Sequence, residues 1–298
     1  MDNVIQAICP ASCGELLQGY IYGGEKLISY GVDLFSKASL IEDKTKEKKI
    51  IPNRYKKAYR IMKEVFKYYD YCEKDYENIV IKIDSKIPIA KGMASSTADL
   101  VATALATATY LNKDITEMEI ARLCINIEPT DSTVFSKLTL FDHLKGDFIK
   151  EYDNLPDCKV LLLEGKEKID TIDFRKTDHT ELLIKNKDIM KKSLEHFEKG
   201  IKNRDLKEIG RASTLSALAN QEILYKSGLE DMIEISEKLG AYGVNVGHSG
   251  SVIGILFNDK NMDIEKFKYE INKKKYIDNY ISFSIYNIVP GGGRIIKP

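Results

Sequence analysis

Hydrophobic and polar positions alternate in short stretches of this chain and recur at helical intervals in longer ones. Ile79, Ile81 and Ile83 alternate against Lys82 and Asp84, which predicts a half-buried β-strand. The segment ADLVATALATATYL, residues 98–111, predicts a helix. Residues 88–99, PIAKGMASSTAD, therefore lead from a strand into a helix.

Small residues dominate this strand-to-helix segment. Gly92, Ala94, Ser95 and Ser96 fall where the amides of the first helical turn have no intrahelical partners and the helix dipole favours an anion. Bulky side chains here would hold phosphate oxygens away from those amides. The segment is a candidate phosphate-binding loop, and the alternative is a tight turn capped by Ser95.

The same patterns predict elements along the rest of the chain. Thr116 and Glu119 form a capping box that opens a helix, and Pro129 ends it. The lysine-rich residues 42–49 are expected to form a solvated turn. The succession is α+β in class, without regular βαβ alternation. Further strands are predicted at 4–9, 26–30, 37–41, 159–165, 251–257 and 282–289, and further helices at 54–73, 180–200, 204–220, 229–239 and 263–274.

A polar segment, EYDNLPDC at residues 151–158, divides the chain near its middle. It contains Pro156 and precedes the buried-looking strand KVLLLEG. A length of 298 residues is sufficient for two domains of ordinary size. We therefore predict two domains, one over 1–156 and the other over 157–298.

Charge and cysteine content limit the classes of partner. Lysine plus arginine and aspartate plus glutamate number 45 each, so no basic field favours nucleic acid or an anionic membrane. The N-terminus lacks a secretory pattern, no apolar run suits a membrane span, and five scattered cysteines suit a reducing compartment. We expect a cytoplasmic protein with a small-molecule partner. Cys9 and Cys13 are interpreted as structural or substrate-lining residues, not as metal ligands.

The loop EPTDST, residues 128–133, sets two carboxylates on either side of a proline turn. Phosphoryl transfer needs a ligand for Mg²⁺ and a group that orients or deprotonates the attacking hydroxyl. Glu128 and Asp131 are suited to divide these tasks. The alternative is a surface acid followed by an ordinary turn residue.

Two further clusters combine small and polar residues. Gly247, Ser249 and Gly250 precede an apolar strand, where a flexible loop can approach a ligand or another loop, or form a hairpin turn. His248 among them is expected to be a hydrogen-bonding surface group.

The other cluster, CPASCGELLQGYIYGG at residues 9–24, is expected to follow the first strand. Its Ser12, Glu15 and Gln18 are suited to binding a small polar substrate, although Leu16 and Leu17 indicate partial burial.

In this order, PASCGELLQG, PIAKGMASSTA and VGHSGS resemble the motifs of the GHMP kinase superfamily, which includes galactokinase, homoserine kinase, mevalonate kinase and phosphomevalonate kinase. The resemblance spans nearly the whole chain. It implies a two-domain α+β fold. The N-terminal ATP-binding and catalytic domain, 1–156, would be similar to a ribosomal protein domain, and the C-terminal GHMP kinase domain, 157–298, would be ferredoxin-like. The central loop departs from the pattern conservatively, at Ala90, Met93, Ala94 and Thr97, where many members have Gly, Leu, Gly and Ala.

Within the superfamily, CPASCGELLQG, GMASSTADLVA and EPTDST resemble the L-threonine kinases of adenosylcobalamin synthesis and propanediol utilisation, which make O-phospho-L-threonine. The resemblance implies ATP and Mg²⁺ as cofactors, with Ser96 and Glu128 holding the metal and Asp131 acting as base or hydroxyl-orienting group. The residues expected to hold the triphosphate are Pro88, Ala90, Lys91, Gly92, Met93, Ala94, Ser95, Ser96 and Thr97. The residues expected at the substrate are Ser12, Glu15, Gln18, Gly247, Ser249 and Gly250.

A zwitterionic acceptor needs an acid for its ammonium group and a cation or amide for its carboxylate. Glu15 is a candidate for the former, and the sequence does not identify the latter. One alternative is a kinase for homoserine or another small alcohol. Another is a catalytically silent nucleotide-binding sensor, against which the acidic pair in EPTDST argues. The sequence makes no prediction of oligomeric state.

Overall fold

The computed structural model describes residues 4–43 and 55–296. Strands and helices are mixed throughout, so the α+β class is confirmed. The predicted lysine-rich turn falls largely on residues 44–54, which lie outside the described part of the chain. The strands are β1 (Ile5–Ile21), β2 (Gly24–Glu42), β3 (Ile79–Ser85), β4 (Leu138–Asp142), β5 (Asp147–Tyr152), β6 (Lys159–Gly165), β7 (Gly243–Val246), β8 (Val252–Phe257), β9 (Tyr280–Val289) and β10 (Arg294–Ile296). The α-helices are α1 (Lys56–Tyr68), α2 (Ser95–Tyr110), α3 (Glu117–Ile125), α4 (Thr171–Phe174), α5 (Thr180–Lys185), α6 (Lys187–Asn203), α7 (Leu206–Asn220), α8 (Leu229–Lys238) and α9 (Ile264–Asn272).

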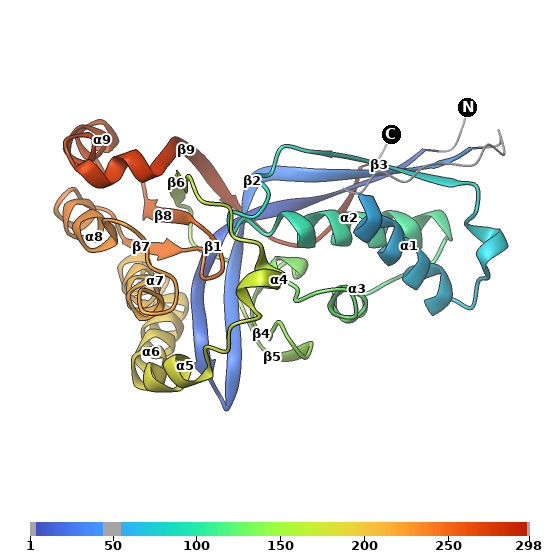
Figure 1. Ribbon diagram of the computed structural model, residues 1–298, viewed down its shortest axis with the longest axis horizontal. Helices are drawn as coiled ribbons and strands as arrows, with labels where there is room; N and C mark the ends of the chain where they lie inside the picture. Colours follow the sequence, from blue (N-terminus) through green and yellow to red (C-terminus); the bar gives the residue numbers. More distant parts are fainter. Residues whose placement is uncertain (1–3, 44–54, 297–298) are drawn as a thin grey trace.

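A long, bent hairpin of β1 and β2 runs from the end near the N-terminus to the middle of the molecule and then past α5 and α6 (Figure 1). Register shifts between Pro10 and Leu17, together with the left-handed backbone of Gly14, bend β1 along its length. In the described chain the sheet order is β10-β1-β7-β8-β6-β9-β2-β4-β5, with β3 on β2 and β1 also paired to β2. The hairpin therefore joins the two groups of helices through one continuous sheet.

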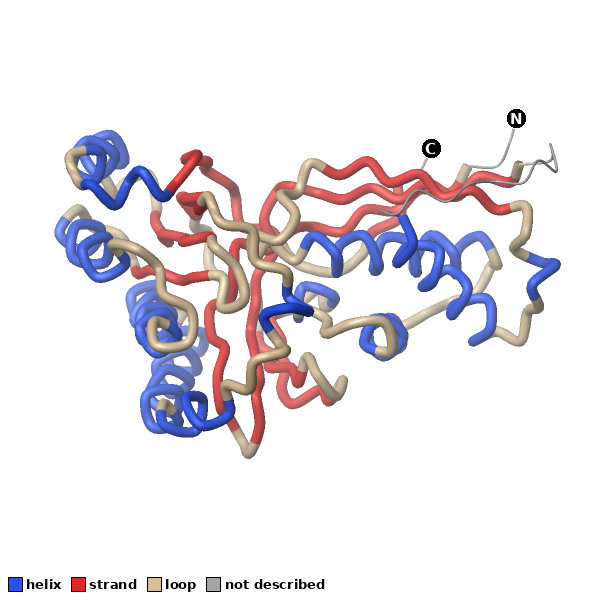
Figure 2. Tube along the Cα trace, in the orientation of Figure 1, coloured by secondary structure: helices blue, strands red, loops and turns tan. Residues whose placement is uncertain are grey.

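Helices α1, α2 and α3 lie at one end, beside β1, β2 and β3 (Figure 2). Alanines such as Ala98 and Ala102 give α2 a small, fully buried surface that packs closely on the hairpin. This packing brings the N-terminus of α2 to the middle of the molecule. No helix in the described residues is both long and apolar enough to cross a membrane.

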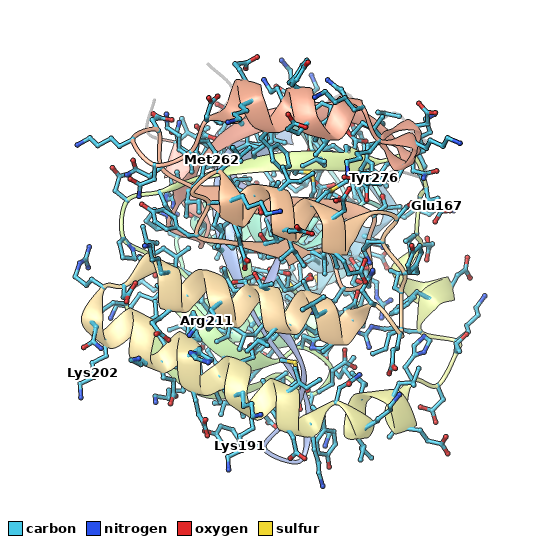
Figure 3. The ribbon with its side chains drawn as sticks, turned by 90° about the vertical axis from the view of Figure 1, so that its left-hand side faces the viewer. Glu167, Lys191, Lys202, Arg211, Met262 and Tyr276 are labelled. Carbon is cyan, nitrogen blue, oxygen red and sulfur yellow. The ribbon has the colours of Figure 1, made fainter. Side chains whose placement is uncertain are left out.

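Helices α6, α7, α8 and α9 cover the sheet at the other end (Figure 3). The apolar sides of α7, α8 and α9 meet β6, β7 and β8 in a core that includes Leu163, Met232 and Phe257, whereas α6 packs on α7 and β1. Lys191, Lys202 and Arg211 extend outward from α6 and α7 into solvent. Amphipathic helices thus bury one face against an apolar sheet, as their sequence period requires.

Several predicted elements are confirmed and others need correction. The capping box of Thr116 and Glu119 is present, and β6 spans the predicted 159–165. The strands expected at 26–30 and 37–41 are a single strand, β2. The placement of residues 9–24 after the first strand was wrong, because β1 continues to Ile21. Bulges that interrupt its alternation hide this continuation from the sequence pattern.

The C-terminal end of the chain returns to the first strand. β10 pairs antiparallel with β1 through Gln6, Ala7 and Ile8. β9 meets β2 at Gly31 and Val32. Residues from the two ends of the sequence therefore share one sheet, and the division into 1–156 and 157–298 stays a prediction.

Candidate active site

A cavity of about 150 Å³ lies at the N-terminus of α2, and all four of the sequence clusters contribute residues to it. Pro88, Lys91, Ser12, Gly247 and Gly250 are not among the residues that line it. The predicted site residues that do line it are Glu15, Gln18, Ala90, Gly92, Met93, Ala94, Ser95, Ser96, Thr97, Glu128, Asp131 and Ser249.

Helix α2 begins in a way that leaves its first turn open. Ala94 is its N-cap, has a left-handed backbone (φ 52°) and supplies no side-chain cap. The capping alternative for Ser95 is therefore wrong, since Ser95 is already the first helical residue. Small side chains and an uncapped helix N-terminus together form a suitable site for an anion.

Lys91 anchors this loop instead of facing the cavity. Its ammonium group is buried and donates to the carbonyl oxygens of Gly165, at 2.5 Å, and Lys166, at 3.1 Å. Its own carbonyl accepts from the backbone N–H groups of Ser251 and Val252. The loop is therefore fixed to β6 and to the turn before β8.

The second glycine cluster supports the loop from behind. Residues 247–251 form the turn between β7 and β8 and press against Gly92, which has a φ of +86°. A Cβ atom added to Gly250 would lie 2.3 Å from the Cα of Gly92. Both readings of this cluster hold, because it is a hairpin turn that closely approaches another loop. Gly247 and Gly250 act through that contact.

Glu128 and Ser96 lie together at the open end of α2. The Ser96 hydroxyl donates to Oε1 of Glu128, and Nζ of Lys57 lies 2.6 Å from Oε2. Nζ of Lys57 is also 3.4 Å from the Ser96 Oγ. A cation is thus already accommodated beside these two oxygen donors, which are of the kind that Mg²⁺ prefers. Lys57 was not predicted, because its place in a lysine-rich helix does not distinguish it.

Asp131 is held by contacts to both of its oxygens. Oδ1 accepts from the N–H of Thr133 and Oδ2 from the hydroxyl of Ser29, each at 2.8 Å. Its own N–H donates to Thr97 Oγ1, which ties the loop to α2. Burial, and secondly the charge of Glu15, raise the pKa of Asp131 to about 6. A carboxyl group that titrates near neutrality is suited to act as a general base.

Arg175, which follows α4, is a site residue that the sequence did not reveal. Its guanidinium group lies 3.3 Å from Glu25 Oε2 and 2.5 Å from His143 Nε2. Burial lowers the pKa of His143 to about 4, so its ring is neutral. Because arginine can only donate, His143 Nε2 accepts and Nδ1 carries the proton. Arg175 and His143 belong to no local sequence motif, so no sequence signal would have identified them.

Two donors of this group have no partner among the described residues. Arg175 Nε and His143 Nδ1 are buried and make no hydrogen bond. Both side chains line the cavity at α2, and Arg175 with Gln18 also borders a second cavity of about 310 Å³. Unpaired buried donors at a cavity wall are suited to receive a ligand acceptor.

Comparisons with known proteins agree with this arrangement. The family described as GHMP kinases N terminal domain matches residues 53–136, and that described as GHMP kinases C terminal matches 197–277. An L-threonine kinase of Salmonella typhimurium is 36% identical over 294 residues, covering 99% of this chain and 96% of that protein. This chain belongs to the GHMP kinase family.

A second L-threonine kinase and a solved structure are also similar to this chain. An L-threonine kinase of Citrobacter freundii is 35% identical, with 96% of this chain and 98% of that protein covered. The crystal structure of a homoserine kinase from Cytophaga hutchinsonii superposes with a TM-score of 0.73 at 15% identity, covering 99% of this chain and 98% of the other. That likeness shows the fold alone.

In this GHMP kinase, His248 is buried and not at the surface. The expectation of a surface group was wrong, because only 4% of His248 is exposed. Its turn is packed between β1 and α7, so the ring is enclosed and bonds to Glu15 and Ser216. Composition alone could not reveal this enclosure.

Proposed function

We propose that this GHMP kinase transfers the γ-phosphoryl group of ATP to the hydroxyl of L-threonine. We propose L-threonine as the acceptor because the chain is similar over nearly its whole length to two L-threonine kinases. The product, O-phospho-L-threonine, would supply the aminopropanol side chain of cobalamin in the cytoplasm, as the sequence resemblance implies.

The uncapped N-terminus of α2 would receive the phosphates of ATP. Ser95, Ser96 and Thr97 open this helix and line the cavity. Ser96 and Glu128 would hold Mg²⁺, which when bound neutralises charge on the triphosphate. Lys57 contributes a second positive charge at the same point.

Asp131 would receive the proton of the acceptor hydroxyl. The hydroxyl oxygen forms a bond to the γ-phosphorus, the bond from that phosphorus to the ADP oxygen breaks, and ADP departs. Thr133 and Ser29 fix the direction of the Asp131 carboxylate before the acceptor arrives. Such alignment supplies much of the rate in a reaction with little covalent participation by the protein.

The cavity offers partners for both charged groups of an amino acid. Glu15 would bind the ammonium group, and Arg175 Nε and His143 Nδ1 would bind the carboxylate, since all three residues line the cavity and the two donors have no partner among the described residues. With Asp131 at the hydroxyl, these contacts match an α-amino acid that carries an alcohol. In this proposal Arg175 and His143 are the partners of the carboxylate, for which the sequence identified no residue.

A panel of acceptors tests this function. The enzyme is incubated with ATP, Mg²⁺ and L-threonine, L-serine, L-homoserine or mevalonate, and phosphorylated product is measured by ³¹P NMR. We expect the highest kcat/KM for L-threonine. Equal or better turnover of L-homoserine would replace the assignment with a homoserine kinase, and nucleotide binding without any product would favour a silent sensor.

A further inference from the structure

Glu15 is held by the histidine of the turn between β7 and β8. The backbone N–H of His248 donates to Glu15 Oε2 at 2.8 Å, and the ring Nδ1 lies 3.0 Å from the same oxygen. One residue of the turn therefore meets the carboxylate of Glu15 with both its backbone and its side chain.

The surroundings of the His248 ring fix its tautomer and its orientation. Nδ1 faces only acceptors, Glu15 Oε2 and the carbonyl of Val246 at 3.2 Å, so it carries the proton. Nε2 lies 2.9 Å from Ser216 Oγ on α7. The same Oγ accepts from the N–H of Gln18, at 3.0 Å. The ring is thus held at both nitrogens by groups that are themselves fixed.

A second layer of buried polar groups holds the turn. Asn220 Nδ2 donates to the carbonyl of His248 at 3.3 Å. Lys226, only 4% exposed, donates from Nζ to Asn220 Oδ1 at 3.2 Å. This row of contacts begins at the end of α7 and reaches Glu15 through His248. Satisfied buried networks of this kind favour one arrangement of their members.

Only one of the two carboxylate oxygens of Glu15 has hydrogen-bond partners among the described residues. Both donors from His248 meet Oε2, and Oε1 takes no hydrogen bond from any residue that the structure describes. Glu15 lines the cavity that contains Asp131, and its charge contributes to raising the pKa of Asp131. Two carboxylates that line one cavity repel, and a cation bound by Glu15 would relieve the repulsion.

We propose that His248 is a positioning residue that presents Oε1 of Glu15 to the ammonium group of the acceptor. It thereby selects amino alcohols over the same alcohols without the amino group. This inference rests on the proposed function, because it assigns a role at the same acceptor site.

Two substitutions of the ring separate positioning from general support. In His248→Asn the amide nitrogen takes nearly the place of Nδ1, whereas in His248→Gln it extends toward Ser216 and away from Glu15. For each variant, kcat and KM are measured with L-threonine, with 3-hydroxybutanoate, which lacks only the amino group, and with ATP. The matched control is His196→Gln, on the surface of α6 and paired with Glu208 at 2.6 Å.

We expect His248→Gln to raise KM for L-threonine about tenfold or more, the effect of losing a hydrogen bond to a charged group. KM for ATP and the constants for 3-hydroxybutanoate should change by less than about twofold. His248→Asn should restore most of the preference for L-threonine, and His196→Gln should match the unaltered enzyme. The decisive quantity is the ratio of the two acceptors' kcat/KM values.

An equal loss for both acceptors, or a rise in KM for ATP, would make His248 a merely structural residue and overturn the proposal. Should His248→Gln not fold, Ser216→Ala decides, since it frees Nε2 without touching Glu15. An unchanged acceptor ratio in that variant overturns the proposal too.

The unaltered enzyme distinguishes the two hypotheses. If it phosphorylates L-threonine and the ratio is insensitive to His248, only this inference fails. If its best acceptor is L-serine or L-homoserine, the proposed function fails, and the ratio is measured with that acceptor and its analogue without the amino group. An enzyme with no acceptor refutes both.

Discussion

Two loops rich in glycine and serine touch each other at the centre of the molecule, yet they face in different directions. Residues 92–97 line the cavity at α2, whereas in residues 247–251 only Ser249 does so. In the second loop, Gly250 packs on Gly92 and the Ser251 hydroxyl donates to the carbonyl of Glu167 at 2.7 Å. Two loops of similar composition therefore differ in their surroundings, since the first lines the cavity and the second packs against the first.

The difference has an energetic consequence. Polar groups that face a cavity are solvated before a ligand arrives, so removing one changes binding or rate more than folding. Groups that face another loop are desolvated on folding, and their removal leaves unpaired partners in the interior. Substitutions in the cavity and in the turn should accordingly affect different measurements.

Glu128→Gln should have the largest effect on the cavity side. We expect kcat to fall at least about a hundredfold, because the amide removes the negative charge that would hold Mg²⁺. ATP binding, measured by calorimetry, should remain detectable. An unaffected kcat would remove Glu128 from the metal site and leave the cavity without its proposed chemistry.

Gly250→Ala should have the largest effect on the support side. Its Cβ would lie 2.3 Å from both the Cα of Gly92 and the carbonyl oxygen of Lys91, so we expect a loss of about 2–3 kcal/mol in the free energy of unfolding. Affinity for ATP should fall as well, because the phosphate loop is displaced. Urea denaturation measures the first effect and calorimetry the second.

Gly23→Ala is the matched control for this substitution. Gly23 has a φ of +80° with no atom within 4 Å of an added Cβ, so only backbone strain of about 1 kcal/mol is expected. If Gly250→Ala costs no more than Gly23→Ala, the two loops are not coupled by close packing.

The pH dependence of the reaction should report Asp131. Its pKa is raised to about 6, and only the ionised form can accept the hydroxyl proton. We therefore expect kcat/KM to fall as the pH drops through about 6, by about tenfold per unit below it. Asp131→Asn should show low activity without this acid limb. The same limb in that variant would assign the titration to another group.

A pair of serine substitutions gives the smallest and most selective contrast. Ser96→Ala should lower kcat/KM for Mg·ATP about tenfold, with a change in unfolding free energy below about 0.5 kcal/mol. Ser251→Ala should cost about 1 kcal/mol through the lost bond to Glu167 and leave kcat within about twofold. The opposite pattern in either variant would contradict the division between the two loops.

Local signals predicted much of the fold but not its long-range pairing. The capping box at Thr116 and the apolar strand β6 depend on neighbours in the chain, so the sequence pattern identified both. β10 was missed because three residues are too few to show an alternating pattern, and the strand is defined by its pairing with β1. The bulges in β1 likewise concealed a strand that the hairpin partner stabilises.

The site followed the same division. Glycines and serines before a helix, and two acids in one short loop, are local patterns with a known chemical use, and they located the cavity. Lys57, His143 and Arg175 come from separate segments and meet only after folding. No local sequence motif contains these three residues, because they lie far apart along the chain.

The sequence by itself determined the family, the strand-to-helix loop of small residues and the acidic pair, since each rests on residues close together in the chain. The tertiary structure decided which glycine loop faces the cavity, that Lys91 anchors instead of contacting it, and that His248 is buried on Glu15. These outcomes depend on burial and on contacts between distant segments. Burial sets the cost of every unpaired polar group, so it decides which side chains support the site and which remain free to bind a ligand.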